Sequence, residues 1–390
     1  MQLIDPGIPT TLATSVRERF RDVFGAEAAV VGRAPGRVNL IGEHTDYNAG
    51  LCLPVALPHA TYAAVRLRED GLIRLRSAQA DEGWEGTLAD IGPGRPSGWP
   101  SYVAGVLWTL ADVGYAVPGI DVFIDSTVPV GAGLSSSAAI ECSVAAAVVH
   151  TLGGTLTDEV RELLVPACMR AETEVAGAPT GGMDQAVSLF AEEGRALLLD
   201  FADGTRTQVA LPLAEAALSF LVIDTRVSHA LVDGGYAARR ADCEEAVTEL
   251  GIASLREATV ADLPRLDDER VRRRVRHVVS EIERVEEVVA AASKGSWQRV
   301  GDLFVASHAS MRDDYEISCP ELDLAVDTAL EHGALGARMT GGGFGGSAIA
   351  LVPADRRDEV GDAIVDAFAA AGLGEPGLLS PDPSAGASLE

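Results

Sequence analysis

One short segment concentrates side chains that could bind a polyhydroxylated ligand. Glu43, His44 and Asp46 place two carboxylates and an imidazole within four residues, inside a polar, turn-rich stretch at 36–50. Such groups are the donors and acceptors that sugar hydroxyl groups require. A metal site is a second interpretation, although the other six histidines lie far away in sequence with no paired ligand spacing. Ordinary turn and capping hydrogen bonds are a third. Composition alone leaves these interpretations open.

A glycine- and serine-rich segment suggests a phosphate site. Glycines let the backbone approach a polyphosphate, and serines at a helix start offer hydroxyl groups beside free N–H groups. The helix dipole adds roughly half a positive charge there, and a serine hydroxyl can ligate Mg²⁺. Simple helix capping by serine is the alternative. The residues concerned are Gly131, Ala132, Gly133, Leu134, Ser135, Ser136 and Ser137.

A second glycine-rich segment, 341–346, formally matches the dinucleotide fingerprint GxGxxG. That fingerprint opens a helix, whereas residues 347–352 form a strand-like apolar run. We therefore interpret these glycines as the wall of a pocket. Lys294 is the only lysine of the chain, and it lies in neither a Walker A loop nor the strand motif of protein kinases. Any nucleotide must be held in another way.

The order of three segments, 36–48, 128–138 and 339–346, resembles that of the GHMP small-molecule kinases. The first reads Gly-Arg-Val-Asn-Leu-Ile-Gly-Glu-His-Thr-Asp-Tyr-Asn and looks like the galactokinase signature within that family. Further matches at 182–185, 236–243 and 307–314 extend the resemblance over nearly the whole chain. It implies an α+β, two-domain GHMP kinase fold with the active site in the cleft between an N-terminal and a C-terminal domain.

The resemblance also implies substrates and site residues. The γ-phosphoryl of ATP, with Mg²⁺, would pass to the anomeric hydroxyl of galactose. Asp184 would be the base and Arg37 the charge stabiliser. Residues that would bind the sugar are Glu43, His44, Thr45, Asp46 and Tyr236. Residues that would contact the nucleotide are Ser77 and 131–137. Ser137 and Glu172 would bind Mg²⁺, although without the resemblance Glu172 reads as an ordinary helix-surface residue.

Two rival functions fit the same resemblance. One is another GHMP kinase, chiefly an N-acetylgalactosamine kinase, although the sequence shows no recognisable pocket for its bulky substituent. The other is a non-catalytic sugar sensor built on the same fold. A sensor could lose its catalytic or metal-binding residues, yet Ser137, Glu172 and Asp184 are all present. The sequence therefore favours an enzyme.

Helices and strands must together position these residues. Apolar periodicity predicts helices at 15–24, 137–152, 157–176, 236–250, 269–292 and 358–371, with Pro166 expected to kink or split the third. Strand-like runs lie at 29–33, 62–67, 122–124, 220–223 and 347–352. We expect an N-terminal domain over 1–205 and a C-terminal domain over 206–390. The Pro-, Ser- and Gly-rich tail at 375–390 is expected to be disordered.

Charge and composition argue against several functions. A net charge of −27 would repel a nucleic-acid backbone. The arginines at 272–274 could suggest a phosphate site, but Glu269, Glu281 and Glu283 favour a solvated, ion-paired helix face. The longest apolar run, 144–149, is much shorter than a membrane span, and no signal-peptide pattern is visible. Five scattered cysteines indicate reduced thiols. We expect a cytoplasmic monomer with no nucleic-acid or membrane partner.

Overall fold

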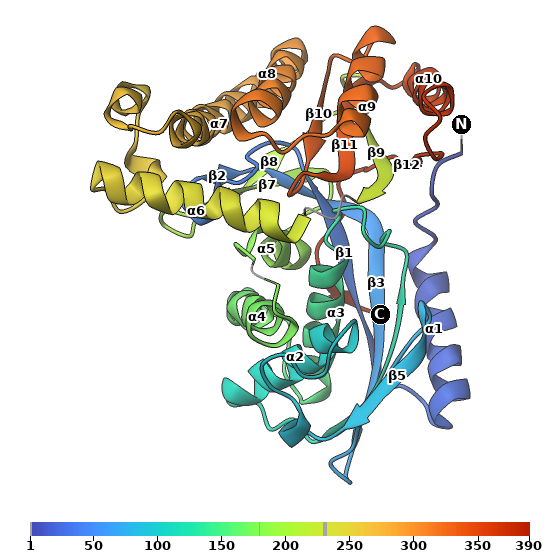
Figure 1. The fold of residues 1–390 in the computed structure, drawn as a ribbon. Coiled ribbons are helices and arrows are strands. Elements are labelled where there is room, and N and C mark those ends of the chain that lie inside the picture. The colour runs from blue at the N-terminus through green and yellow to red at the C-terminus, as the bar shows by residue number, and fades with distance from the viewer. Residues whose placement is uncertain (1, 179, 229–231) are drawn as a thin grey trace.

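The computed structural model describes residues 2–178, 180–228 and 232–390, and within them it combines helices with three β-sheets (Figure 1). The predicted α+β class is confirmed. Strand-forming residues of the first half alternate between two apolar clusters, so the large sheet is buried on both faces. Val31, Tyr62 and Phe123 face α1, whereas Val30, Ala63 and Val122 face the helices of the opposite side.

The first half of the chain forms most of a six-stranded sheet in the order β13-β1-β3-β6-β4-β5. Its strands are β1 (Val30–Asn39), β3 (Pro54–Arg68), β4 (Ile73–Ser77), β5 (Ala80–Gly86), β6 (Gly119–Ser126) and β13 (Ser388–Leu389). Helix α1 (Pro9–Phe24) covers one face (Figure 1). The other face carries α2 (Pro100–Asp112), α3 (Ser136–Thr151), α4 (Asp158–Arg170) and α5 (Met183–Phe190).

The second half builds a four-stranded sheet in the order β10-β11-β9-β12. Its strands are β9 (Leu218–Ser228), β10 (Gly336–Thr340), β11 (Gly345–Pro353) and β12 (Gly377–Leu379). The helices of this half are α6 (Val232–Leu250), α7 (Glu269–Ser293), α8 (Trp297–Ser310), α9 (Pro320–Glu331) and α10 (Arg357–Ala370). A small sheet of β2 (Leu51–Cys52), β7 (Arg195–Asp200) and β8 (Arg206–Ala210) lies beside them. One apolar cluster runs from the end of β1 into this half and joins the two parts.

The expectation of a disordered tail at 375–390 is wrong. Strand β12 pairs with β9, and β13 pairs with β1 in the first sheet. Leu378, Leu379 and Ala387 are buried, so a few apolar residues suffice to dock this segment on the sheet edges. The boundary expected at 205/206 stays a prediction; it falls between β7 and β8, which pair with each other.

Pro166 lies inside α4 and does not split it. The helix continues to Arg170 and then widens into a π-helix, η3 (Ala171–Ala176). Single π-helical turns are often found at functional sites. Here the widened turn carries Glu172.

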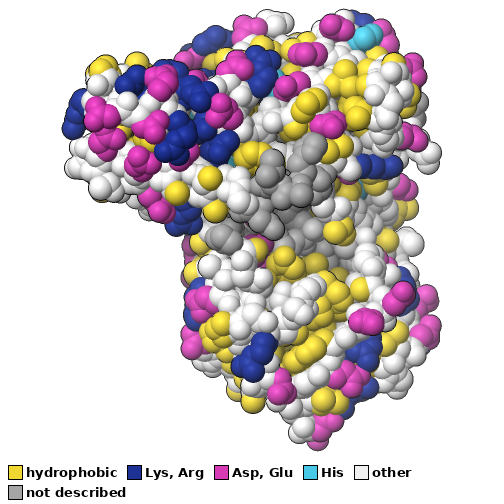
Figure 2. Space-filling model, in the orientation of Figure 1, with side chains coloured by type: hydrophobic (Ala, Val, Ile, Leu, Met, Phe, Trp, Pro, Cys, Tyr) yellow, Lys and Arg dark blue, Asp and Glu magenta, His cyan; other side chains and the backbone are white. Residues whose placement is uncertain are grey.

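The solvated face expected on α7 is only partly present. Glu269 and Glu283 are exposed, but Arg274 and Glu281 are buried in ion pairs with other elements. On the visible surface, charges of both signs are mixed (Figure 2). Within the described ranges, no helix is both long and apolar enough to cross a membrane.

Candidate active site

Most residues expected at the sugar and at the reacting group line one cavity of about 160 Å³. The cavity lies where the first sheet and its helices meet α6 and the turn between β10 and β11. Its predicted lining residues are Arg37, Glu43, His44, Asp46, Glu172, Asp184 and Tyr236. Gly341 and Gly342 also line it, which confirms that the second glycine segment forms a pocket wall.

A second cavity, of about 410 Å³, contains the predicted nucleotide residues Ser77, Gly131, Ser136 and Ser137. The Ser137 hydroxyl lies close enough to the carboxyl group of Glu172, in the first cavity, to lower its pKa, so the two cavities meet at this pair. Strand β4 supplies Ser77, the glycine loop before α3 supplies Gly131, and the first turn of α3 supplies Ser136 and Ser137.

Two aromatic residues of this second cavity, Trp99 and Tyr102, were missed from the sequence. Their flat faces suit a nucleotide base, because every base has a π-face. Trp99 lies just before α2. Nothing local distinguishes such a residue from an ordinary core anchor, so only the fold could place it here.

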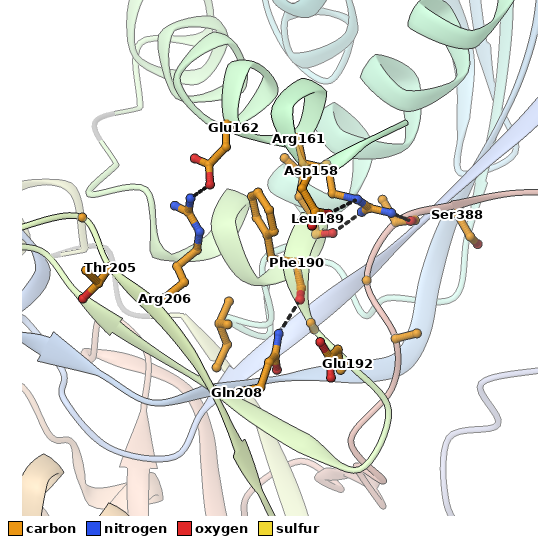
Figure 3. Close-up of a pocket in the computed structure, with 16 residues that line it drawn as sticks. Asp158, Arg161, Glu162, Leu189, Phe190, Glu192, Thr205, Arg206, Gln208 and Ser388 are labelled. Atoms are coloured by element: carbon orange, nitrogen blue, oxygen red, sulfur yellow. Dashed lines mark hydrogen bonds and ion pairs between the residues drawn. The ribbon is translucent and has the colours of Figure 1, made fainter. Parts of the chain in front are cut away.

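A third cavity, of about 740 Å³, lies away from these residues (Figure 3). It is lined by the start of α4, the end of α5, the β7–β8 hairpin and 385–388. Arg206 pairs with Glu162, and Arg161 donates to the carbonyl oxygens of Leu189 and Ala387. The two arginines are therefore already engaged, and none of the predicted site residues lines this cavity.

Arg37 and Asp184 form the central pair of the first cavity. The Nε and Nη2 atoms of Arg37 donate to the two carboxylate oxygens of Asp184 at 2.8 and 2.9 Å. Its Nη1 atom donates to the carbonyl oxygen of Gly133 at 2.6 Å. Ser135 donates its hydroxyl to Asp184 and does not cap α3. The pair thus ties β1, the glycine loop and the first turn of α5 together.

Glu172 is a buried carboxyl group with few compensating charges. Burial raises its pKa to about 7, and the nearby Asp184 carboxylate adds to the rise. Gln185 donates from Nε2 to Glu172 at 2.6 Å and to Glu141 at 3.0 Å. The helix-surface alternative is therefore wrong for Glu172, which is only 8% exposed.

His44 is held as a neutral ring in a left-handed backbone conformation, with φ of 61°. Its Nε2–H donates to the carbonyl oxygen of Gly342 at 3.1 Å, so Nδ1 accepts from the Tyr47 hydroxyl at 2.7 Å. Burial lowers the pKa of the ring to about 3. The His44 and Tyr236 rings lie 5.0 Å apart. Both ring nitrogens of His44 are therefore already engaged.

Asp46 and Thr45 are neighbours in sequence, but only Asp46 lines the cavity. Asp46 lines the cavity, and burial raises the pKa of its carboxyl group to about 6. A Cβ atom on Gly181 would lie 1.8 Å from its Oδ2 atom, so a side chain at 181 would displace the Asp46 carboxylate. Thr45 is fully buried and donates to the carbonyl oxygens of Gly42 and Leu51, and it does not line the cavity.

Family models match three parts of the chain. They are the galactokinase galactose-binding signature over residues 18–67, the N-terminal domain of GHMP kinases over 101–192, and the C-terminal domain over 288–370. A galactokinase of Streptomyces coelicolor is 52% identical over 384 residues, which cover 96% of this chain and 98% of that protein. The chain belongs to the galactokinase family.

Other galactokinases agree with this assignment. One from Mycobacterium tuberculosis is 44% identical over 348 residues, 88% of this chain and 95% of that protein. The crystal structure of Lactococcus lactis galactokinase complexed with galactose has a TM-score of 0.91 at 31% identity, covering 97% of this chain and 99% of that one. A mevalonate kinase with 18% identity and a TM-score of 0.61 shares the fold alone. The predicted two-domain GHMP kinase fold is confirmed.

The galactokinase signature match contains Arg37 and 43–46, and the GHMP N-terminal match contains the glycine loop, Glu172 and Asp184. Ser77, Trp99 and Tyr236 lie outside all three matched ranges. Their place at the site rests on the fold, because β4, the start of α2 and α6 bring them to the two cavities.

Proposed function

We propose that this chain transfers the γ-phosphoryl group of ATP to the anomeric hydroxyl of α-D-galactose, giving α-D-galactose 1-phosphate and ADP. The observation that carries the proposal is the Arg37–Asp184 pair. It lies in the first cavity and is bonded to the glycine loop that borders the second. A sugar in the first cavity and a nucleotide in the second, called below the sugar cavity and the nucleotide cavity, would meet at this pair.

The roles of the chain's own groups follow from phosphoryl-transfer chemistry. Asp184 accepts the proton of the attacking hydroxyl or orients that hydroxyl, since a loose transition state asks little of a base. The Arg37 guanidinium stabilises negative charge on the transferring group. The N–H groups of 131–135 precede α3 and those of Ser136 and Ser137 belong to its first turn, and a polyphosphate is favoured at such a helix start.

The sugar would be held mainly by Asp46 and Tyr236. Asp46 lines the cavity, and within the described parts of the chain its carboxyl group is bonded by backbone N–H groups, chiefly that of Tyr47, and by no side chain, so it can still accept from sugar hydroxyl groups. His44 would shape the cavity wall through its ring, because its nitrogens are engaged. Thr45 would hold the loop in place through its hydroxyl, which bonds the carbonyl oxygens of Gly42 and Leu51.

The residues present fit a magnesium ion held jointly with ATP. Ser137 and Glu172 lie close together where the two cavities meet, and Glu172 has the Asp184 carboxylate nearby. Among the described residues no group of three or more His, Cys, Asp or Glu side chains could hold a metal alone. Mg²⁺ is commonly bound by one or two protein oxygens plus substrate phosphates. When bound, it neutralises charge on the phosphate oxygens.

We also propose a cytoplasmic monomer. All five cysteines are free and buried, as expected where thiols stay reduced. The exposed large apolar side chains lie on separate elements, for example Ile8, Val260 and Val305. No nucleic-acid or membrane partner is expected for a chain with net charge −27.

An ADP-release assay with MgATP and a panel of sugars tests the function. Galactose should be phosphorylated, and glucose should be a poor substrate because a misdirected hydroxyl leaves buried polar groups unpaired. Turnover of glucose equal to that of galactose would contradict the proposal. A preference for N-acetylgalactosamine would assign the chain to that substrate instead.

A further inference from the structure

The carboxylate of Glu43 is held by groups from the second half of the chain. Its Oε2 atom accepts from Nη2 of Arg338, and its Oε1 atom accepts from the Thr340 hydroxyl and the Gly341 N–H, both at 3.1 Å. All three donors belong to β10 or to the turn that follows it. Glu43 itself lines the sugar cavity, whereas Arg338 does not. Strand β10 therefore sets the direction in which Glu43 meets the cavity.

Arg338 makes several further bonds to the same loop. Its side chain has no exposed surface, and its Nη1 atom donates to the carbonyl oxygen of Leu40 at 2.8 Å. Its Nη2 atom also lies 3.4 Å from Oε1 of Glu281, a second carboxylate with no exposed surface. The planar guanidinium can make these bonds at once because its donors point in fixed, different directions.

Glu281 holds the loop from the other side. Its Oε1 atom accepts from the Gly42 N–H at 3.1 Å and from the Ser307 hydroxyl at 2.6 Å. Its Oε2 atom accepts from Nε of Arg284 at 2.7 Å. Two carboxylates thus face two guanidinium groups, so the buried set is charge-balanced. Like Arg338, Glu281 does not line either the sugar or the nucleotide cavity.

We propose that Arg338 and Glu281 are positioning residues for the sugar: together they fix residues 40–43 and aim the Glu43 carboxylate into the sugar cavity. The proposal rests on the sugar-binding role proposed for that cavity. It extends the site beyond the signature motif, since Glu43 and Arg338 lie 295 residues apart in sequence. A group that only stabilised the fold would affect sugar and nucleotide alike.

The test separates sugar affinity from general stability. Arg338→Lys keeps the positive charge but cannot bond Glu43, Leu40 and Glu281 together. Glu281→Gln keeps the shape and removes the charge, and it decides the question if the lysine variant does not fold. Each should raise the galactose KM and the galactose Kd from calorimetry about tenfold or more, as expected for a lost charge-assisted bond. The ATP KM should stay within about twofold.

Asp121→Asn is the matched control. Asp121 is also a carboxylate with no exposed surface, and it pairs with Arg66, Arg68 and Arg74 at the far side of the first sheet, lining neither cavity. This variant should lower Tm while leaving the galactose KM unchanged. Folded Arg338 or Glu281 variants with unchanged galactose affinity, or with equal losses for galactose and ATP, would overturn the proposal. A wild-type enzyme that does not bind galactose would instead overturn the proposed function.

Discussion

Arg37 binds both carboxylate oxygens of Asp184 through a two-point contact, with N–O distances of 2.8 and 2.9 Å. Such fork-like pairing fixes orientation as well as distance. The third contact of Arg37, to the Gly133 carbonyl, locks the pair to the glycine loop. Asp184 lies in the first turn of α5, but Gly182 holds the N-cap position. Helix capping is therefore not the role of Asp184.

We expect Asp184→Asn to lower turnover by about 10²–10⁴-fold, the usual contribution of a positioned base. A purely structural helix-start residue would cost about 1 kcal/mol of stability and leave the rate largely intact. Turnover measured beside Tm distinguishes the two. A folded variant that keeps most of the wild-type turnover would refute the assignment.

Arg37→Lys should not restore full activity. A lysine carries one ammonium group and cannot reproduce the contacts to both Asp184 oxygens and the Gly133 carbonyl. We expect a loss of kcat larger than any loss of galactose affinity, because the guanidinium acts on charge in the transition state. Steady-state kinetics with both substrates provide the measurement, and a lysine variant with wild-type kcat would contradict it.

Ser137→Ala and Glu172→Gln should each raise the Mg²⁺ concentration needed for half-maximal rate. Both groups lie where the two cavities meet, so weaker ligation should appear first in the metal titration. Glu174→Gln is a close control, because Glu174 lies in the same π-helix but pairs with Arg170 at the surface. Unchanged titrations for Ser137 and Glu172 variants would show that neither binds the metal.

Much of the candidate site could be predicted because many of its residues are contiguous in sequence. The segments 43–46 and 131–137 carry glycines and polar groups whose spacing limits the local chain path. Asp184 and Glu172 were predicted only through the family resemblance. Nothing in their local sequence distinguishes them from other acids at helix positions.

Other parts depend on tertiary contacts that no local pattern records. Nothing in the sequence singles out Arg338, yet it is fully buried and its main partners are about 60 and 300 residues away in sequence. Glu281 looked solvated because its helix is highly charged, but its face of α7 turns inward. The tail at 375–390 looked disordered because composition does not reveal that both sheets offer it an edge.

The pKa of Glu172 predicts a pH-dependent metal requirement. Burial raises this pKa to about 7, so lowering the pH from 8 to 6 replaces the carboxylate with the neutral acid. Protons and Mg²⁺ compete for a ligating carboxylate, so the apparent Mg²⁺ affinity should fall about tenfold over this range. Glu172→Gln should remove this part of the dependence. An equally steep dependence in the variant would assign it to the nucleotide alone.

Gly181→Ala should weaken galactose binding and leave ATP binding unchanged. A Cβ atom there would lie 1.8 Å from Oδ2 of Asp46, so the carboxylate must move out of its place in the sugar cavity. We expect the galactose KM to rise about tenfold or more, the scale of one lost hydrogen bond to a charged group. Gly374→Ala is the control, since a Cβ atom there meets nothing within 4 Å. If Gly181→Ala keeps the wild-type galactose KM, Asp46 is not a sugar ligand; if galactose and ATP are lost together, the substitution has disturbed the whole cleft and the specific role of Asp46 is refuted.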